Sequence, residues 1–128
     1  MKKSLGLVLL SSLLSLSINV AVAAESKLEL LAGVEAGSNA GTSMTTTDLS
    51  KTQKILSSLM KGAVDSWYNI DSTTHFDVKI GEHYSLNLRP CIAYEVTTKH
   101  DSKTENQNLN ACKNYEGQWI ALDSTLSM

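Results

Sequence analysis

Two alternating stretches, each with one of the two cysteines, place the strongest constraint on the fold of this chain. Cys91 begins the first stretch and Cys112 ends the second, and apolar residues recur at every second position in both, which is typical of half-buried strands. The apolar positions are Ile92, Tyr94, Val96, Leu109 and Ala111. When the stretches are paired with Cys91 facing Cys112, all of these fall on one face. A slip of one residue would move either set to the other face, so the cysteines and the apolar pattern independently select one antiparallel register.

The facing cysteines are expected to form a disulfide, because opposed cysteines on neighbouring antiparallel strands can lie within bonding distance. Closing this loop should stabilise the fold by about 3 kcal/mol in the chain-entropy model. Two buried free thiols are the alternative, since an unpaired cysteine behaves as a small apolar residue. Zinc is not expected, because the chain has no CxxC motif and no nearby histidine pair. The polar run between the strands, residues 99–106, is predicted to be a loop.

The dipeptide Glu116-Gly117 predicts a tight turn after the second stretch, because glycine readily adopts positive φ. Pairing Tyr115 with Gln118 across this turn would place Ile120 on the apolar face. The chain after the turn would then add a further strand to the same sheet.

The face opposite the apolar one is the predicted contact surface. The register just described places Trp119 on this face, where we expect it to cover the disulfide, with a ligand platform as the alternative. Glu95 and Asn110 lie on the same face of the paired strands. Trp119, Glu95 and Asn110 are therefore the candidate contact residues.

Several fixed positions in the C-terminal half follow the pattern of a known bacterial family. They are Arg89, Pro90, Cys91, Tyr94, Ala111, Cys112, Lys113, Gly117 and Trp119. In this pattern the chain resembles the C-terminal module of the seventeen-kilodalton outer-membrane surface antigens, whose members carry a sequence close to R-x-C-R-x-[YF], then A-C-R and a D-G-x-W turn. Leu49-Ser50 and Trp67-Tyr68-Asn69 match the family's helix and its W-x-N motif more loosely. The resemblance covers residues 49–122.

The chain departs from the family pattern at three positions. Ile92 and Lys113 stand where arginines usually follow the cysteines, and Glu116 stands where the turn usually has aspartate. The resemblance therefore does not carry over a role for those arginines in binding an anionic partner. It implies a non-enzymatic envelope protein that acts by contact with an envelope or host-surface component. A soluble periplasmic binding or inhibitor protein is the alternative.

Residues 1–23 are predicted to be a secretory signal peptide. Lys2 and Lys3 supply the basic start, an apolar stretch follows, and Ala21-Val22-Ala23 matches an A-x-A cleavage site. An uncleaved membrane anchor is the alternative, but the apolar stretch is short and serine-rich for a spanning helix. No cysteine lies near the cleavage site, so the lipid attachment common in the antigen family is not expected. Export would place the protein in the periplasm or at the outer-membrane surface, without a transmembrane segment after cleavage.

The charge balance argues against a nucleic-acid partner. The chain has a formal net charge of −2, and removal of residues 1–23 takes away two lysines and no acid, which leaves about −4. Proteins that bind nucleic acid carry a basic patch, and the sequence shows none. The remaining chain of about a hundred residues suffices for one domain with a modest core.

Residues 24–47 are predicted to be a flexible linker rich in Ala, Gly, Ser and Thr. The dipeptide Ala-Gly recurs every four residues at 32–33, 36–37 and 40–41. This spacing would stack the glycines on one face of a helix, like the glycine-zipper segment of the antigen family. Polar residues interrupt the run, however, and each glycine weakens a helix by about 1 kcal/mol, which favours the linker.

Residues 48–128 are expected to form an α+β domain. A helix is predicted over 48–64, capped by Thr47 or Asp48. Its apolar stripe consists of Ile55, Leu56, Leu59, Met60, Ala63 and Val64. The helix should pack on a small, curved antiparallel sheet of four or five strands, sealed by the aromatic residues of Trp67-Tyr68-Asn69.

Two strand arrangements are open for residues 74–88. Phe76, Val78 and Ile80 alternate with polar residues, as in a half-buried strand. The chain either turns at Gly81-Glu82-His83, or continues as one strand to Tyr84 and turns in the following SLNL, as the family resemblance suggests.

No catalytic, cofactor or metal site is expected. His75 and His83 could share a strand face with Asp77, which is a weak signal for metal binding or acid–base chemistry, because the chain has no H-x-H or H-E-x-x-H spacing. Nucleophile-elbow, P-loop and dinucleotide-binding motifs do not occur in the sequence. The predicted disulfide would also leave no thiol nucleophile.

Overall fold

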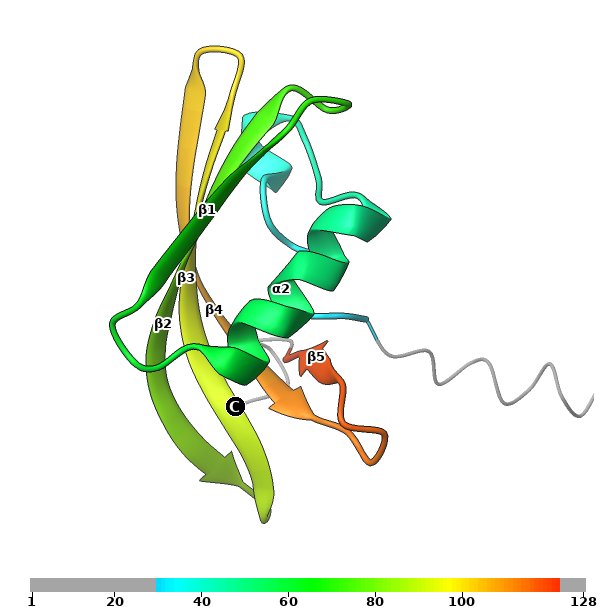
Figure 1. Cartoon of the computed structure of the whole chain (residues 1–128), viewed down its shortest axis with the longest axis vertical. Coiled ribbons are helices and arrows are strands. Elements are labelled where there is room, and N and C mark those ends of the chain that lie inside the picture. Colours follow the sequence, from blue (N-terminus) through cyan, green and yellow to red (C-terminus); the bar gives the residue numbers. More distant parts are fainter. Residues whose placement is uncertain (1–29, 123–128) are drawn as a thin grey trace, which may run out of the picture.

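A computed structural model describes residues 30–122, which form one α-helix packed on a five-stranded antiparallel sheet with the strand order β1-β2-β3-β4-β5 (Figure 1). In chain order the elements are η1 (Ser38–Ala40, a 3-10 helix), α2 (Thr46–Ser58), β1 (Val64–Asn69), β2 (Thr74–Leu86), β3 (Arg89–His100), β4 (Lys103–Lys113) and β5 (Trp119–Ala121). The predicted α+β fold, with a helix on an open antiparallel sheet and a cross-strand disulfide, is confirmed. The predicted signal peptide, residues 1–23, lies outside the described residues.

The hairpin of β3 and β4 has the predicted register. Cys91 pairs with Cys112 and forms the disulfide. On the core face, Ile92 pairs with Ala111 and Tyr94 pairs with Leu109. Apolar residues of both strands face α2, and both cysteines lie on the other face of the sheet, where they are buried. The disulfide thus crosses two neighbouring strands on the face that does not carry the main core.

The loop predicted over residues 99–106 is wrong. β3 continues to His100 and β4 begins at Lys103, so only Asp101 and Ser102 connect the strands. Asp101 adopts a φ of 57°, a left-handed conformation that aspartate tolerates because its short side chain bonds locally. The polar sequence therefore extends a long hairpin.

The strand from residue 74 is a single long strand, as in the second of the two arrangements. β2 pairs with β3 along its length, and the register shifts between Ile80 and His83. Gly81 lies in this bulge, where an ideal Cβ would come 2.9 Å from the Ala93 carbonyl oxygen, so a larger residue would push the strands apart. The turn falls at Asn87 and Leu88, with φ of 51° and 69°.

Helix α2 begins and ends earlier than predicted. Thr45 is the N-cap, and Asp48 closes a capping box with it. The helix stops at Ser58 because Leu59 is already extended, with φ −96° and ψ 156°. Gly62 then has a φ of 90°, and Val64 begins β1. Of the apolar residues beyond the helix, Leu59 packs against the core, whereas Met60 and Val64 are exposed.

The side chain of Asp48 joins the start of α2 to β1. It is 1% exposed, and its carboxylate accepts hydrogen bonds from the Trp67 Nε1 at 2.8 Å, the Asn69 Nδ2 at 2.8 Å and the Thr45 backbone N at 2.9 Å. Burial acts to raise the pKa of Asp48, but the hydrogen bonds from Thr45, Trp67 and Asn69 outweigh it and lower the pKa below 3.8. Trp67 and Asn69 are thus structural partners of the helix start.

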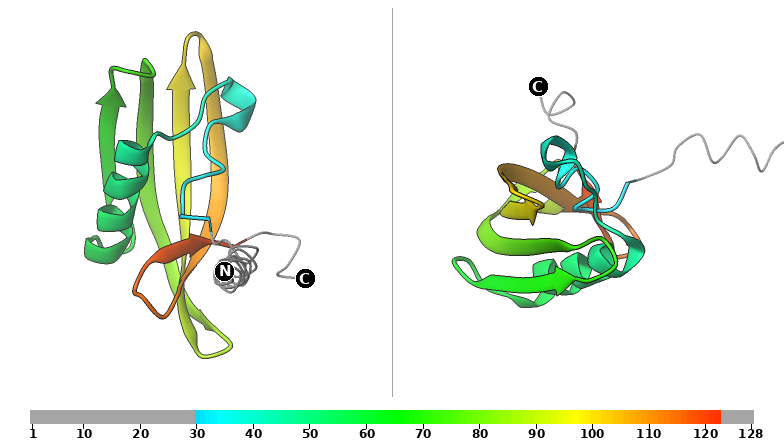
Figure 2. Two further views of the ribbon diagram at one scale, coloured as in Figure 1. Left: turned by 90° about the vertical axis from the view of Figure 1, so that its right-hand side faces the viewer. Right: turned by 90° about the horizontal axis from the view of Figure 1, so that it is seen from above.

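Residues 30–44 form a second cover over the sheet, beside α2. The helix lies over the β1–β2 half of the sheet, and residues 30–44 run over the β3–β4 half (Figure 2). Ala32, Ala36 and Ala40 are buried, and the first two belong to the core. The predicted flexible linker is therefore wrong for this part, whereas residues 24–29 of the predicted linker lie outside the described residues.

The Ala-Gly repeat produces consecutive turns. Gly33, Gly37 and Gly41 have φ of 100°, 86° and 83°, which glycine adopts without steric cost. Each turn brings the next alanine down onto the sheet. Glu105 and Gln107, on the core face of β4, bind the backbone of these turns: the Glu105 carboxylate accepts from the Asn39 N and the Ala40 N, and Gln107 bonds the Gly37 N and the Glu35 carbonyl oxygen.

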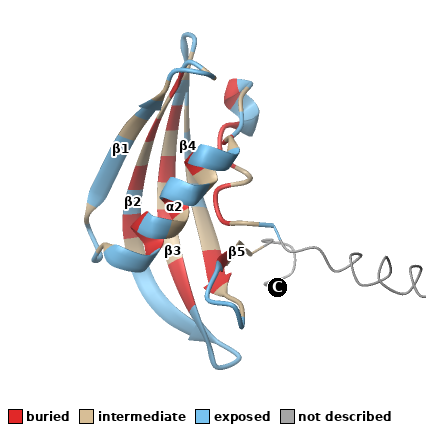
Figure 3. Ribbon diagram, turned by 45° about the vertical axis from the view of Figure 1, so that its right-hand side comes forward, coloured by how far each residue is buried: buried red, intermediate tan, exposed pale blue. Residues whose placement is uncertain are grey.

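The core lies between the concave face of the sheet and these two covers (Figure 3). Its largest fully buried side chains from the sheet and the helix are Phe76, Leu56, Ile80, Ile92, Val78 and Val96. Trp67 closes the β1 side, with its ring centroid 5.5 Å from that of Phe76.

Replacing Asp48 with asparagine should lower the free energy of unfolding at neutral pH by about 2–4 kcal/mol, because a buried acceptor of several hydrogen bonds loses its charge. The pKa of Asp48 is depressed in the folded state, so its contribution is complete above pH 3.8 and is lost as the pH falls through the lower folded-state value. Urea unfolding measured from pH 7 to pH 2 should show that the difference in the free energy of unfolding between wild type and D48N decreases below about pH 4. Asp71→Asn, at an exposed position, is the matched control; equal pH profiles for D48N and wild type would contradict this role.

Replacing Gly37 and Gly41 separately with alanine tests whether residues 30–44 are packed. Both sites have positive φ, so both variants should lose about 1 kcal/mol of unfolding free energy. A Cβ at Gly37 would also lie 2.8 Å from the Thr42 Cγ2, whereas at Gly41 nothing lies within 4 Å. Thermal unfolding should therefore show a further loss of about 1–3 kcal/mol for G37A alone. Two equal and negligible effects would indicate a linker.

Candidate functional site

The three candidate contact residues do not lie on one surface. Glu95 and Asn110 face away from α2, as predicted. Trp119 faces α2 instead, because β5 pairs one residue out of the predicted register, with Lys113 opposite Trp119 and Cys112 opposite Ile120. The turn is longer than two residues: the Asn114 backbone N bonds the Gln118 carbonyl oxygen, and Gly117 has a φ of 83° inside it.

Trp119 is a core residue held by α2. It is 4% exposed, and its indole Nε1 donates to the Ser57 Oγ at 3.0 Å. Its backbone N and carbonyl oxygen both bond the side-chain amide of Gln53, at 2.9 and 2.7 Å. The predicted place of Trp119 beside the disulfide is wrong, and its side chain is not available to a partner.

Glu95 and Asn110 line a shallow groove on the outer face of the sheet. The groove has a volume of about 290 Å³. Its lining also includes Lys79, Gly81, Ala93 and Asn108. The small residues Gly81 and Ala93 leave the space open, and the polar side chains surround it. The Tyr84 hydroxyl donates to the Asn110 Oδ1 at 2.8 Å, which fixes one amide at the rim. Such a groove offers hydrogen bonds to a polar ligand.

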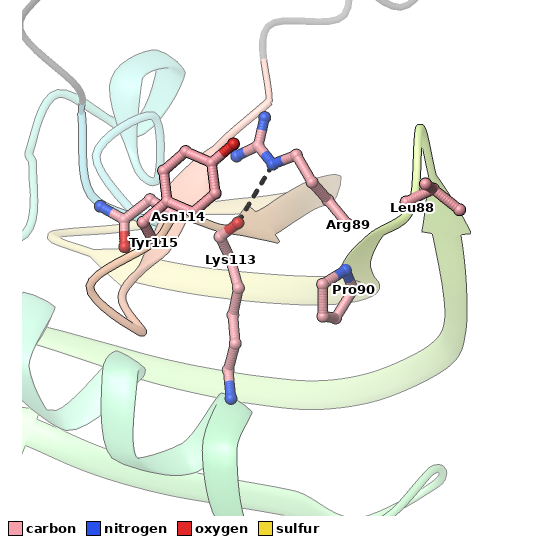
Figure 4. A pocket seen from close by; sticks show the side chains of 6 residues that line it. All are labelled: Leu88, Arg89, Pro90, Lys113, Asn114 and Tyr115. Carbon is pink, nitrogen blue, oxygen red and sulfur yellow. Dashed lines mark hydrogen bonds between the residues drawn. The ribbon is translucent and has the colours of Figure 1, made fainter.

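A second cavity lies at the end of the sheet, and we call it the terminal hollow (Figure 4). Its volume is about 370 Å³, and it is lined by Leu88, Arg89, Pro90, Lys113, Asn114 and Tyr115. It forms because the pairing of β3 and β4 ends at the disulfide. Pro90 has no N–H to continue the ladder, and the Asn114 side chain turns β4 away by accepting from the Glu116 N and the Gln118 N.

Two cations flank the terminal hollow and point in different directions. The Arg89 Nε donates to the Lys113 carbonyl oxygen at 3.1 Å, which holds the guanidinium at the hollow (Figure 4). Within residues 30–122 no acceptor binds its terminal nitrogens. The Lys113 Nζ instead turns toward the helix side, 5.2 Å from the centre of the Trp119 ring. Arg89 is thus the donor that the hollow presents.

The sequence contained only an indirect signal for the terminal hollow. Arg89 and Pro90 belong to the family-like motif, and Tyr115 flanks the predicted Glu116-Gly117 turn. Their meeting depends on where the β3–β4 ladder stops and on the β4–β5 turn. Neither the length of that turn nor the position of Leu88 follows from a residue pattern.

His75 and His83 do not share a strand face, contrary to the prediction. His75 and Asp77 share the outer face, with 3.7 Å between the His75 Nδ1 and the Asp77 Oδ1. His83 follows the bulge and pairs with Ile92, which places it on the other face. The Ser66 hydroxyl donates to Asp77, whereas an activated serine would donate to a base such as imidazole. Residues 30–122 contain no group of three His, Cys, Asp or Glu side chains that could hold a metal ion.

No protein-family model, curated protein or solved structure matches this chain. The resemblance to the outer-membrane surface antigens therefore stays a prediction. Within the part of the chain that the structure describes, no helix has the length and apolar character needed to span a membrane.

Replacing Trp119 and Tyr115 separately with alanine tests the corrected placement of the two aromatic residues. W119A should lower the free energy of unfolding by about 3–5 kcal/mol, because a large core side chain is lost. Tyr115 is fully exposed, so Y115A should leave the stability unchanged. Denaturant unfolding of the two variants measures both effects. A stable W119A variant would place Trp119 on the surface after all.

Proposed function

We propose that this protein is a non-enzymatic, exported cell-envelope protein, similar to the outer-membrane surface antigens, that acts by contact with another envelope or host-surface component. The observation that carries the proposal is the buried disulfide between Cys91 and Cys112. Disulfides form and persist in oxidising compartments outside the cytosol. The predicted signal peptide, residues 1–23, is consistent with that location.

A contact role is also supported by the two cavities. The outer groove and the terminal hollow expose hydrogen-bond donors, acceptors and apolar groups, but neither contains a nucleophile beside a base. The net charge of −2 disfavours nucleic acid as the partner. Glu95, Asn110 and Arg89 are the residues that we expect to meet the partner.

A soluble periplasmic binding or inhibitor protein is the second candidate. The long β3–β4 hairpin favours it, because its two-residue turn at Asp101 and Ser102 lies at an exposed end of the sheet (Figure 1). A stiff hairpin of this kind can enter a partner with little loss of conformational freedom. The sequence also has no cysteine near the predicted cleavage site for a lipid anchor.

Fractionation of the native host and an intact mass under non-reducing conditions would test the proposal. We expect a chain that starts at Ala24, is two hydrogens lighter than the reduced form, and is found in the outer-membrane fraction. The same mass in the soluble periplasm would favour the second candidate. A mass that retains Met1, or free thiols, would contradict both.

A further inference from the structure

The turn between β2 and β3 carries a leucine that folding does not favour. Leu88 is 96% exposed and has a φ of 69°. A two-residue turn with positive φ at both positions prefers asparagine or glycine, and Asn87 satisfies this preference at the first position. Leu88 therefore combines backbone strain with an apolar side chain in water. A strained conformation without a benefit for folding points to a role outside the fold.

Leu88 is part of a group of exposed apolar side chains at one end of the sheet. Tyr115, in the β4–β5 turn, is fully exposed and lies across the terminal hollow from Leu88. Leu86 and Pro90, next to the β2–β3 turn, are exposed as well. The two turns lie at the end of the sheet opposite the Asp101–Ser102 turn (Figure 1). One approaching surface could therefore meet both turns.

The charge at this end selects an anionic partner. Arg89 presents its guanidinium at the terminal hollow, whereas the Lys113 ammonium points toward the Trp119 ring, and no acidic side chain lines the hollow. Glu116 shares the β4–β5 turn but is not among the lining residues. The chain as a whole is negative, whereas the lining of this hollow has cationic residues and no acidic one.

We infer that the β2–β3 and β4–β5 turns, with the terminal hollow between them, dock onto an anionic phospholipid surface. Leu88 would enter the boundary between headgroups and acyl chains, Tyr115 would lie at the level of the headgroups, and Arg89 would bind a lipid phosphate. A free anion would engage Arg89 but would leave Leu88 and Tyr115 in water. The inference rests on the proposed envelope location and names lipid as the component that the protein contacts.

This docking sets the orientation of the protein. The sheet would stand on the membrane with the disulfide next to the bilayer and the Asp101–Ser102 turn pointing away. The disulfide joins β3 and β4 at their last pair before the β2–β3 and β4–β5 turns. It would therefore fix the position of these two turns relative to each other.

Sedimentation with vesicles of phosphatidylcholine, with and without phosphatidylglycerol, tests the inference on the protein as recovered from its host. Wild type should bind the anionic vesicles more strongly. Arg89→Gln should lower the partition coefficient about fivefold, and Leu88→Asn should lower it about tenfold. Lys103→Gln, which removes a cation at the opposite end of the sheet, should leave it unchanged. Any binding through other segments is common to all four proteins.

Leu88→Asn also separates binding from folding. Asparagine accepts positive φ more readily than leucine, so thermal unfolding of L88N should occur at or above the wild-type temperature. Weaker vesicle binding by a variant at least as stable as wild type supports the docking. Unchanged binding by both L88N and R89Q, or equal binding of wild type to neutral and anionic vesicles, would overturn it. If the protein does not bind vesicles but fractionates with the outer membrane in its native host, the lipid inference is wrong and the proposed function stands. If the protein binds vesicles but contains free thiols, the proposed function is contradicted and the lipid inference stands.

Discussion

The contact between α2 and the sheet depends on the carboxylate of Asp48. A buried carboxylate is costly unless several donors compensate it, and Asp48 has donors from its own helix start and from β1, in Trp67 and Asn69. The same group therefore caps the helix and selects the strand against which the helix begins. At the other side of the sheet, Gln53 and Ser57 bond Trp119. The helix is thus tied by polar contacts at both edges of an apolar core.

A single short helix cannot cover a five-stranded sheet, and residues 30–44 supply the remaining cover. An irregular segment over a core must satisfy its backbone hydrogen bonds without a ladder. Glu105 and Gln107 do this from the core face of β4. These two polar side chains interrupt the apolar pattern of that face, and their hydrogen bonds allow the Ala-Gly turns to pack there. The two features are complementary, although 65 or more residues separate them in the chain.

Pairing that is local and periodic could be predicted from the sequence, whereas contacts set by turns and distant partners could not. The Cys91–Cys112 register followed from period-two alternation, because both faces of the hairpin had to agree. The flexible linker failed because its glycine spacing fits a helix, a linker and a series of turns equally well. Trp119 failed because its face depends on the length of the turn that begins at Asn114. Of the candidate site, Glu95 and Asn110 were placed on one face correctly, but the terminal hollow requires knowing where the β3–β4 ladder ends.

The terminal hollow and the hydrophobic core lie in different parts of the sheet, and the disulfide separates them. Beyond Cys91 and Cys112, β3 and β4 no longer pair with each other, although Arg89 still pairs with Leu86 of β2. The side chains of Leu88 and Tyr115 are exposed there and are not part of the core. Evolution could place charge or apolar surface there at little cost in stability, since exposed substitutions change it only slightly. An exposed leucine at positive φ next to an arginine is then hard to attribute to folding. This separation also means that changes at the docking end report on binding while the Asp48 contacts keep the fold intact.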